Sequence, residues 1–154
     1  MGILSLFKKK NSFFSEEEKQ QIVDAIRTSE RTTSGEIRVF VESKNSFVDP
    51  VDRAAQVFFK LRMDHTEHRN AVLLYLAMKH HELALFADEG IYQAIGKEFW
   101  DHEVVLITRA FKADRLVEGI VNCIVDIGKL LQEKFPYEPE TDKNELPDEI
   151  VFGK

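Results

Sequence analysis

The chain has 154 residues, of which 44% are hydrophobic and 31% charged, and its formal net charge is -6. This length favours one compact domain, because two halves of about 75 residues would each have a thin core. The chain has no excess of positive charge that would attract nucleic acid, so we do not expect nucleic acid as a partner. The single cysteine, Cys123, excludes an intramolecular disulfide, and its apolar neighbours indicate a buried, inert thiol.

The sequence also lacks the signals of export and of membrane insertion. No apolar run approaches the roughly 20 residues that span a bilayer. At the start of the chain the apolar residues, Met1 to Phe7, come before the lysines. In a secretory signal the basic residues come before the apolar core. We therefore predict a cytoplasmic protein. Residues 1–14 could lie on an anionic membrane surface, but we favour an N-terminal arm that packs onto the domain.

Hydrophobic periodicity and capping signals divide the rest of the chain into helices and strands. Ser15 and Glu18 form a capping box that starts the first helix, and Asp49-Pro50 starts the second. Strands are indicated by alternation or by short, continuous apolar runs. In chain order we predict helix 15–30, strand 36–42, helix 50–62, strands 71–78 and 82–88, helices 90–100 and 103–112, and a long helix from after Asp114 to Phe135-Pro136.

This order predicts an α/β fold, in which a small mixed β-sheet of three to four strands is sandwiched between helices. The turn at His80-His81 is too short for a crossover, so strands 71–78 and 82–88 form an antiparallel hairpin. Helix 50–62 should connect two parallel strands by a right-handed crossover. The domain would cover residues 15–136, followed by an acidic, flexible tail over 137–154.

The predicted topology brings distant segments to one edge of the sheet. The starts of the first two strands and the end of the third lie there together. Four side chains that carry oxygen atoms belong to these segments: Glu36, Asn70, Asp88 and Glu89. The sequence therefore predicts that they converge.

The same segments carry a resemblance. In order, the motifs are Ser34-Gly35-Glu36-Ile37-Arg38-Val39, Arg69-Asn70-Ala71-Val72-Leu73-Leu74-Tyr75-Leu76, Ala87-Asp88-Glu89-Gly90-Ile91, Phe99-Trp100 and Phe135-Pro136. Together they resemble the TPM domain family, which is named after thylakoid-lumen, photosystem-repair and acid-phosphatase-like members, over about residues 15–136. The resemblance implies an α/β sandwich, divalent metal binding (calcium in some members) and a weak phosphatase activity.

Calcium and magnesium prefer oxygen ligands, which adjacent carboxylates and an amide can supply. We therefore expect a divalent cation, calcium first and magnesium second, at Asp88, Glu89, Asn70 and Glu36. The competing interpretation is that Asp88 caps the helix after it and that Glu36 and Glu89 are solvated charges.

A rival site consists of Asp64, His65, His68, Arg69 and His102. The spacing of His65 and His68 is compatible with zinc, but surface histidines in a loop explain the pattern as well. Arg69 could bind a phosphate, and an ion pair with Asp88 or Glu89 explains it equally well.

Two functions follow from these expectations. The first is a metal-binding interaction or regulatory module, in which the ion orders the edge loops and a protein partner contacts the surface. The alternative is a weak metal-dependent phosphatase that acts on phosphomonoesters. We favour the first, because the sequence contains no identifiable nucleophile or base with a supporting group.

Overall fold

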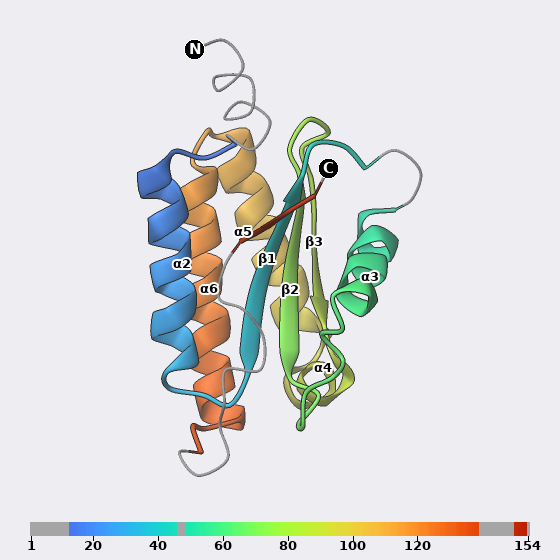
Figure 1. Cartoon of the computed structure of the whole chain (residues 1–154), viewed down its shortest axis with the longest axis vertical. Helices are drawn as coiled ribbons and strands as arrows, with labels where there is room; N and C mark the ends of the chain where they lie inside the picture. Colours follow the sequence, from blue (N-terminus) through green and yellow to red (C-terminus); the bar gives the residue numbers. More distant parts are fainter. Residues whose placement is uncertain (1–12, 46–48, 139–149, 154) are drawn as a thin grey trace.

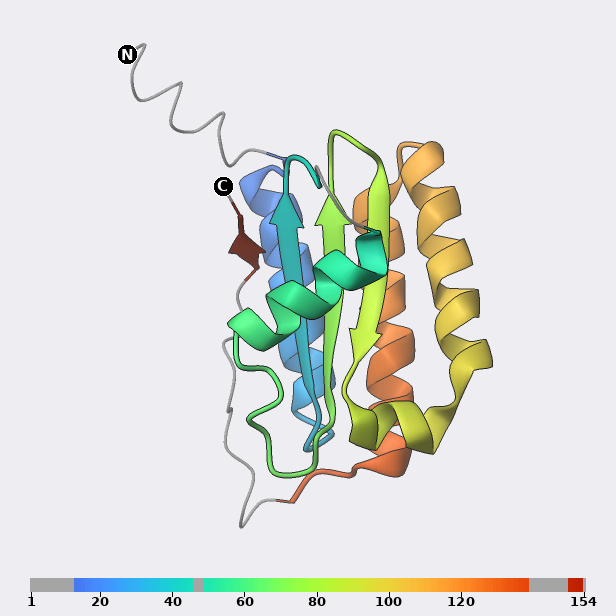
Figure 2. The ribbon, with the colours of Figure 1, turned by 90° about the vertical axis from the view of Figure 1, so that its right-hand side faces the viewer.

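A four-stranded mixed sheet lies between two layers of helices in the computed structural model of the chain (Figure 1). The structure describes residues 13–45, 49–138 and 150–153. Helices α2, α5 and α6 cover one face of the sheet, and α3 crosses the other face (Figure 2). The predicted α/β fold is confirmed. The elements are α2 (Glu16–Glu30), β1 (Glu36–Glu42), α3 (Pro50–Lys60), β2 (Ala71–Ala77), β3 (Glu82–Ala87), α4 (Glu89–Ile95), α5 (Lys97–Lys112), α6 (Leu116–Lys134) and β4 (Val151–Phe152).

The strand register confirms the predicted topology. The strand order is β3-β2-β1-β4. β1 and β2 are parallel, and Glu36 pairs with Ala71. β2 and β3 form the antiparallel hairpin, in which Val72 pairs with Ala87. The beginnings of β1 and β2 and the end of β3 therefore lie at one edge.

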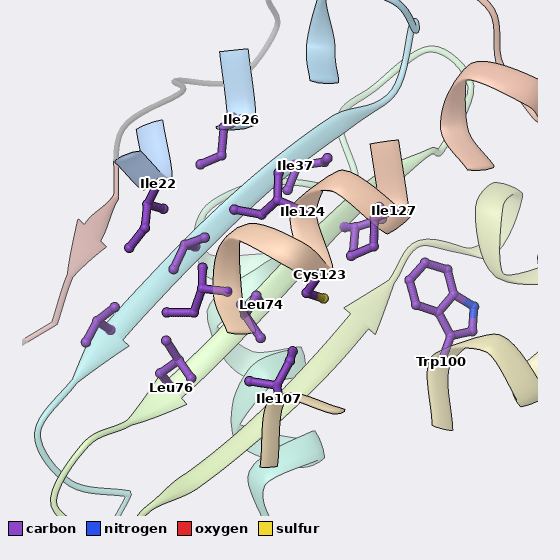
Figure 3. Packing of buried hydrophobic residues seen from close by; sticks show 14 of the residues in the cluster. Ile22, Ile26, Ile37, Leu74, Leu76, Trp100, Ile107, Cys123, Ile124 and Ile127 are labelled. Atoms are coloured by element: carbon purple, nitrogen blue, oxygen red, sulfur yellow. The ribbon is translucent and has the colours of Figure 1, made fainter. Parts of the chain in front are cut away.

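Alternation along the strands divides the core into two clusters. On β1, Ile37, Val39 and Val41 face α2, α5 and α6, whereas Phe40 belongs to the cluster under α3. In the larger cluster, Cys123 and Trp100 pack among isoleucines and leucines of the helices and strands (Figure 3). Cys123 is a free, buried cysteine, as the sequence predicted.

Two helices differ from their predicted bounds. The sequence predicted helices over 90–100 and 103–112, but the break between α4 and α5 lies at Gly96, whose φ is +92°. Only glycine adopts this backbone conformation without strain. Asp101 and His102, which lie between the two predicted helices, are instead exposed residues within α5.

The end of the chain contains a strand that the sequence did not predict. Val151 and Phe152 pair in parallel with Phe40 and Val41 of β1, so β4 adds a fourth strand at this side of the sheet. Two expectations reach beyond the described part: the N-terminal arm over residues 1–12 and the tail over residues 139–149. Phe14, at the end of the predicted arm, is buried in the larger core cluster. No helix in the described ranges is long and apolar enough to cross a membrane.

Candidate functional site

The backbone joins the predicted segments at the edge where β1 and β2 begin. The amide N of Glu36 donates to the carbonyl O of Asn70 at 3.4 Å, and the amide N of Asp88 donates to the carbonyl O of Ala71 at 2.9 Å. Paired residues of a sheet share a face. Glu36 and Asp88 therefore lie on the same face, one on each side of Ala71, about 10 Å apart at their Cα atoms from two strand spacings.

Arg69 forms ion pairs with both acidic residues at the end of β3, Asp88 and Glu89. The side chain of Asp88 is 3% exposed and accepts two hydrogen bonds from Arg69, Nε to Oδ2 at 2.6 Å and Nη2 to Oδ1 at 2.7 Å. Nη1 of the same guanidinium lies 3.2 Å from Oε1 of Glu89. This bidentate geometry is a strong one for an arginine and a carboxylate. The ion-pair interpretation of Arg69 is confirmed.

Asp88 also caps α4. Its Oδ1 accepts a hydrogen bond from the amide N of Glu89 at 2.8 Å, so it satisfies a free amide at the start of the helix. Gly90 lets this turn approach the preceding loop, because a Cβ on Gly90 would lie 2.3 Å from the carbonyl O of His68. The helix-cap interpretation of Asp88 is thus confirmed, and Gly90 serves close packing.

Asn70 carries an unsatisfied oxygen at this edge. The residue is 1% exposed, and its Nδ2 donates to Oγ of Ser34 at 3.3 Å. Its Oδ1 is buried and accepts no hydrogen bond from the described residues. A buried acceptor in this state costs about 1–3 kcal/mol. Asn70 Oδ1 is therefore an atom at this edge that a ligand could satisfy.

The donor set fits a hard cation in type, but Arg69 holds part of it. Glu36, Asp88 and Asn70 are buried and supply carboxylate and amide oxygens. Within the described ranges, no three histidine, cysteine or acidic side chains gather closely enough to hold an ion. Binding at this edge would therefore require Arg69 to leave Asp88.

The rival site is not assembled among the described residues. His65 Nε2 lies 3.8 Å from Asp64 Oδ1, whereas His68 Nε2 lies 3.7 Å from Oε1 of Glu138. His102 is an exposed residue of α5, on the other side of the sheet from α3. The loop therefore directs its two histidines to separate partners. His80-His81 forms the hairpin turn at the opposite edge, as expected.

Sequence reasoning missed a buried acid at that opposite edge. Glu42 accepts hydrogen bonds from Arg53, Nε to Oε2 at 2.8 Å and Nη2 to Oε1 at 2.9 Å, and Oε2 also accepts one from the hydroxyl of Tyr75. Burial raises the pKa of Glu42, but these hydrogen bonds and the charge of Arg53 outweigh it and lower the pKa. Burial, followed by the hydrogen bond to Glu42, raises the pKa of Tyr75. Both carboxylate oxygens of Glu42 accept hydrogen bonds, so we assign this cluster a structural role.

A second missed acid is Glu103, which lies between α5 and α6. It is 2% exposed, and burial together with the neighbouring Asp126 raises its pKa to about 7. Its position in the sequence was informative, because it lies on the apolar stripe of a helix between Trp100 and Ile107. An acid at such a position indicates a buried carboxyl group with a special environment.

Comparison with known proteins agrees with this fold. The structure resembles the BA42 protein of the psychrophilic bacterium Bizionia argentinensis, with 39% identity, a TM-score of 0.85, and coverage of 93% of this chain and 97% of that protein.

Two more distant structures share the fold. They are the N-terminal domains of the cg2496 protein of Corynebacterium glutamicum (14% identity, TM-score 0.59, 79% of this chain and 76% of that one) and of a protein from P. gingivalis (12% identity, TM-score 0.66, 80% of each). None of the curated proteins matches the sequence. The sequence profile of the TPM domain matches residues 8–130, and the chain therefore belongs to the TPM domain family.

Proposed function

We propose that this TPM domain binds a divalent cation, calcium or magnesium, at the β1–β2–β3 edge and acts as an interaction or regulatory module. The observation that carries the proposal is the Oδ1 atom of Asn70, a buried acceptor without a hydrogen bond from the described residues. It lies at the edge where the buried carboxylates of Glu36 and Asp88 flank Ala71. Oxygen ligands of these types suit both ions.

In this proposal, Arg69 and the cation compete for Asp88. The guanidinium neutralises Asp88 and Glu89 in the cation-free state. Cation binding releases Arg69 and draws the loop before β2 and the start of α4 into a new arrangement. A protein partner would contact this rearranged surface, so the ion acts as the switch. Coupling of this kind requires that the cation bind one arrangement more tightly than the other.

The experiment measures the thermal stability of the protein with calcium, magnesium or zinc, together with residue-resolved NMR. At a concentration of about 100 times the dissociation constant, a bound cation should stabilise the fold by about 2.7 kcal/mol. Amide signals should change at Arg69, Asn70 and Asp88. Asp88→Ala should remove most of the response, whereas Glu82→Ala, at the other end of β3, should retain it.

Arg69→Gln separates the proposal from a purely structural ion pair. If Arg69 competes with the cation, this variant should bind the cation about tenfold more tightly, or about 1.4 kcal/mol. If the ion pair is only structural, the variant loses stability and gains no response to metal. A wild-type protein that does not respond at millimolar cation, with Arg69→Gln equally unresponsive, would refute the site.

The phosphatase alternative remains a prediction with its own test. Purified protein would have to hydrolyse a generic phosphomonoester in a cation-dependent manner, and Asp88→Asn would have to abolish the turnover. Cation binding without turnover would favour the interaction module.

A further inference from the structure

A pocket of about 300 Å³ lies between α5 and α6, away from the β1–β2–β3 edge. Ala110 of α5 and Gly119 of α6 line it, and a Cβ on Gly119 would lie 2.5 Å from the Cβ of Ala110. Ligand pockets in proteins occupy about 300–1,000 Å³, so this one suits a small molecule.

The inner wall of the pocket is acidic and incompletely paired. Glu103 of α5 and Asp126 of α6 line it, together with the thiol of Cys123. Glu103 is 2% exposed, and its Oε1 is buried without a hydrogen bond from any residue that the structure describes. Burial and the proximity of Asp126 raise the pKa of Glu103 to about 7. A ligand that donates hydrogen bonds and carries a positive charge would satisfy both carboxyl groups.

Two arginines line the outer part of the pocket, together with the exposed Glu118. Arg109, in the last turn of α5, and Arg115, at the start of α6, line the pocket and are exposed. Neither guanidinium forms an ion pair with another residue in the described part of the chain. Guanidinium groups bind carboxylates through parallel hydrogen bonds. The pocket thus offers acceptors inside and donors outside.

We propose that the pocket binds a small zwitterion of the amino-acid class. The ammonium group of the ligand donates to Glu103 and Asp126, and its carboxylate accepts from Arg109 and Arg115. This ligand uses both charged walls of the pocket. The proposal is independent of the cation site, because the two regions share no residue.

A bare metal ion fits the pocket less well. Calcium takes six to eight oxygen ligands. Within the described residues, no three histidine, cysteine or acidic side chains form a group that could hold an ion. A metal ion would also leave the two arginines without a role. The charge pattern therefore favours an organic zwitterion.

The first arm of the test changes the ligand. The common L-amino acids are added singly at millimolar concentration to the full chain, and amide signals of residues 103–126 are followed by NMR. At least one amino acid should shift the signals of the pocket. Its N-acetyl derivative lacks the ammonium group and its amide lacks the carboxylate, so each should bind at least about tenfold more weakly.

The second arm changes the protein. Glu103→Gln and Arg109→Gln should each weaken binding by about tenfold or more. The matched controls, Asp101→Asn on the exposed face of α5 and Arg31→Gln after α2, should bind as the wild type does. The ligand derivatives keep the test decisive if a pocket variant fails to fold.

Three results would overturn the proposal. The first is that no amino acid shifts the pocket signals at millimolar concentration. The second is that both derivatives bind as well as the parent amino acid, which would mean that the pocket does not recognise the ammonium and carboxylate groups of the ligand. The third is that calcium chloride alone shifts the signals and Glu103→Gln removes the shift, which would identify a metal site instead.

Discussion

Two glutamates are almost completely removed from water, but their surroundings are opposite. Glu42, on β1, is 4% exposed and accepts two hydrogen bonds from Arg53 and one from Tyr75. Glu103, on α5, lies near Asp126, and its Oε1 accepts no hydrogen bond from the described residues. The guanidinium of Arg53 neutralises the carboxylate of Glu42, whereas the carboxyl group of Glu103 lies next to a second acid, Asp126.

The comparison shows that neighbours, rather than burial, decide what a buried acid does. Burial raises the pKa of both groups. For Glu42 the donors outweigh burial and lower the pKa, while for Glu103 the second acid adds to burial. A carboxylate with a full set of donors is part of the fold, but one with a vacant acceptor is available to a ligand. Asp88 is intermediate, because Arg69 neutralises it beside the unsatisfied Asn70.

The largest effect should come from removing Glu42. Glu42→Ala leaves the buried hydroxyl of Tyr75 and the guanidinium of Arg53 without their acceptor. We expect a loss of about 3 kcal/mol in the free energy of unfolding, the scale for breaking a buried ion pair. Urea denaturation measures the loss. Glu17→Ala, an exposed change in α2, should cost no more than about 0.5 kcal/mol, and equal losses for the two variants would contradict the structural role of Glu42.

The second prediction concerns how the free energy of unfolding depends on pH through Glu103. Because its pKa is raised from 4.5 to about 7, the folded state holds a proton that the unfolded state releases. The linkage therefore lowers stability as the pH rises from about 5 to about 8, by about 2–3 kcal/mol. The groups that face Glu103 from α6 are Asp126 and Cys123, with Glu118, Arg109 and Arg115 around the same pocket.

Glu103→Gln isolates this contribution, because glutamine keeps the shape and does not titrate. The difference in the free energy of unfolding between variant and wild type should shift in favour of the variant as the pH rises. Asp101→Asn, an exposed change in the same helix, should give a curve parallel to the wild type. A Glu103→Gln curve that is also parallel would show that Glu103 is ionised throughout this range. Glu42, with its lowered pKa, should contribute in the opposite direction, since its stabilisation is lost as the pH falls below about 4.5.

Local patterns in the sequence were sufficient to predict most of the fold. The alternation in 36–42 and the continuous apolar run from Ala71 located β1 and β2, and the capping box at Ser15 located the start of α2. Each of these signals depends on residues that are close in the sequence. The parallel register of β1 and β2 then followed from the intervening helix, and it brought the predicted edge segments together.

Contacts between distant segments were harder to predict. The ion pair of Glu42 and Arg53 depends on how α3 crosses the sheet, which periodicity does not encode. Arg69 was recognised, but both of its alternatives were compatible with the sequence until the bidentate contact with Asp88 was seen. β4 is only two residues long and pairs with a strand far away in the chain, so Val151 and Phe152 are too short a run to show the alternation of a strand.

The smallest effect concerns this fourth strand, which lies beside Glu42. The amide N of Gly153 donates to the carbonyl O of Val41 at 2.8 Å, and Lys19 Nζ lies 5.5 Å from the ring centroid of Phe152. A chain that ends at Glu138 should lose about 1 kcal/mol, the scale of a net hydrogen bond together with an exposed cation–π contact. It should also reduce the cost of Glu42→Ala, because the edge of β1 becomes open to water. Urea denaturation of the truncated chain, with Phe152→Ala as a full-length control that keeps the backbone pairing, measures both effects. An unchanged free energy of unfolding would mean that β4 adds nothing to the sheet and that the tail behaves as its composition predicted.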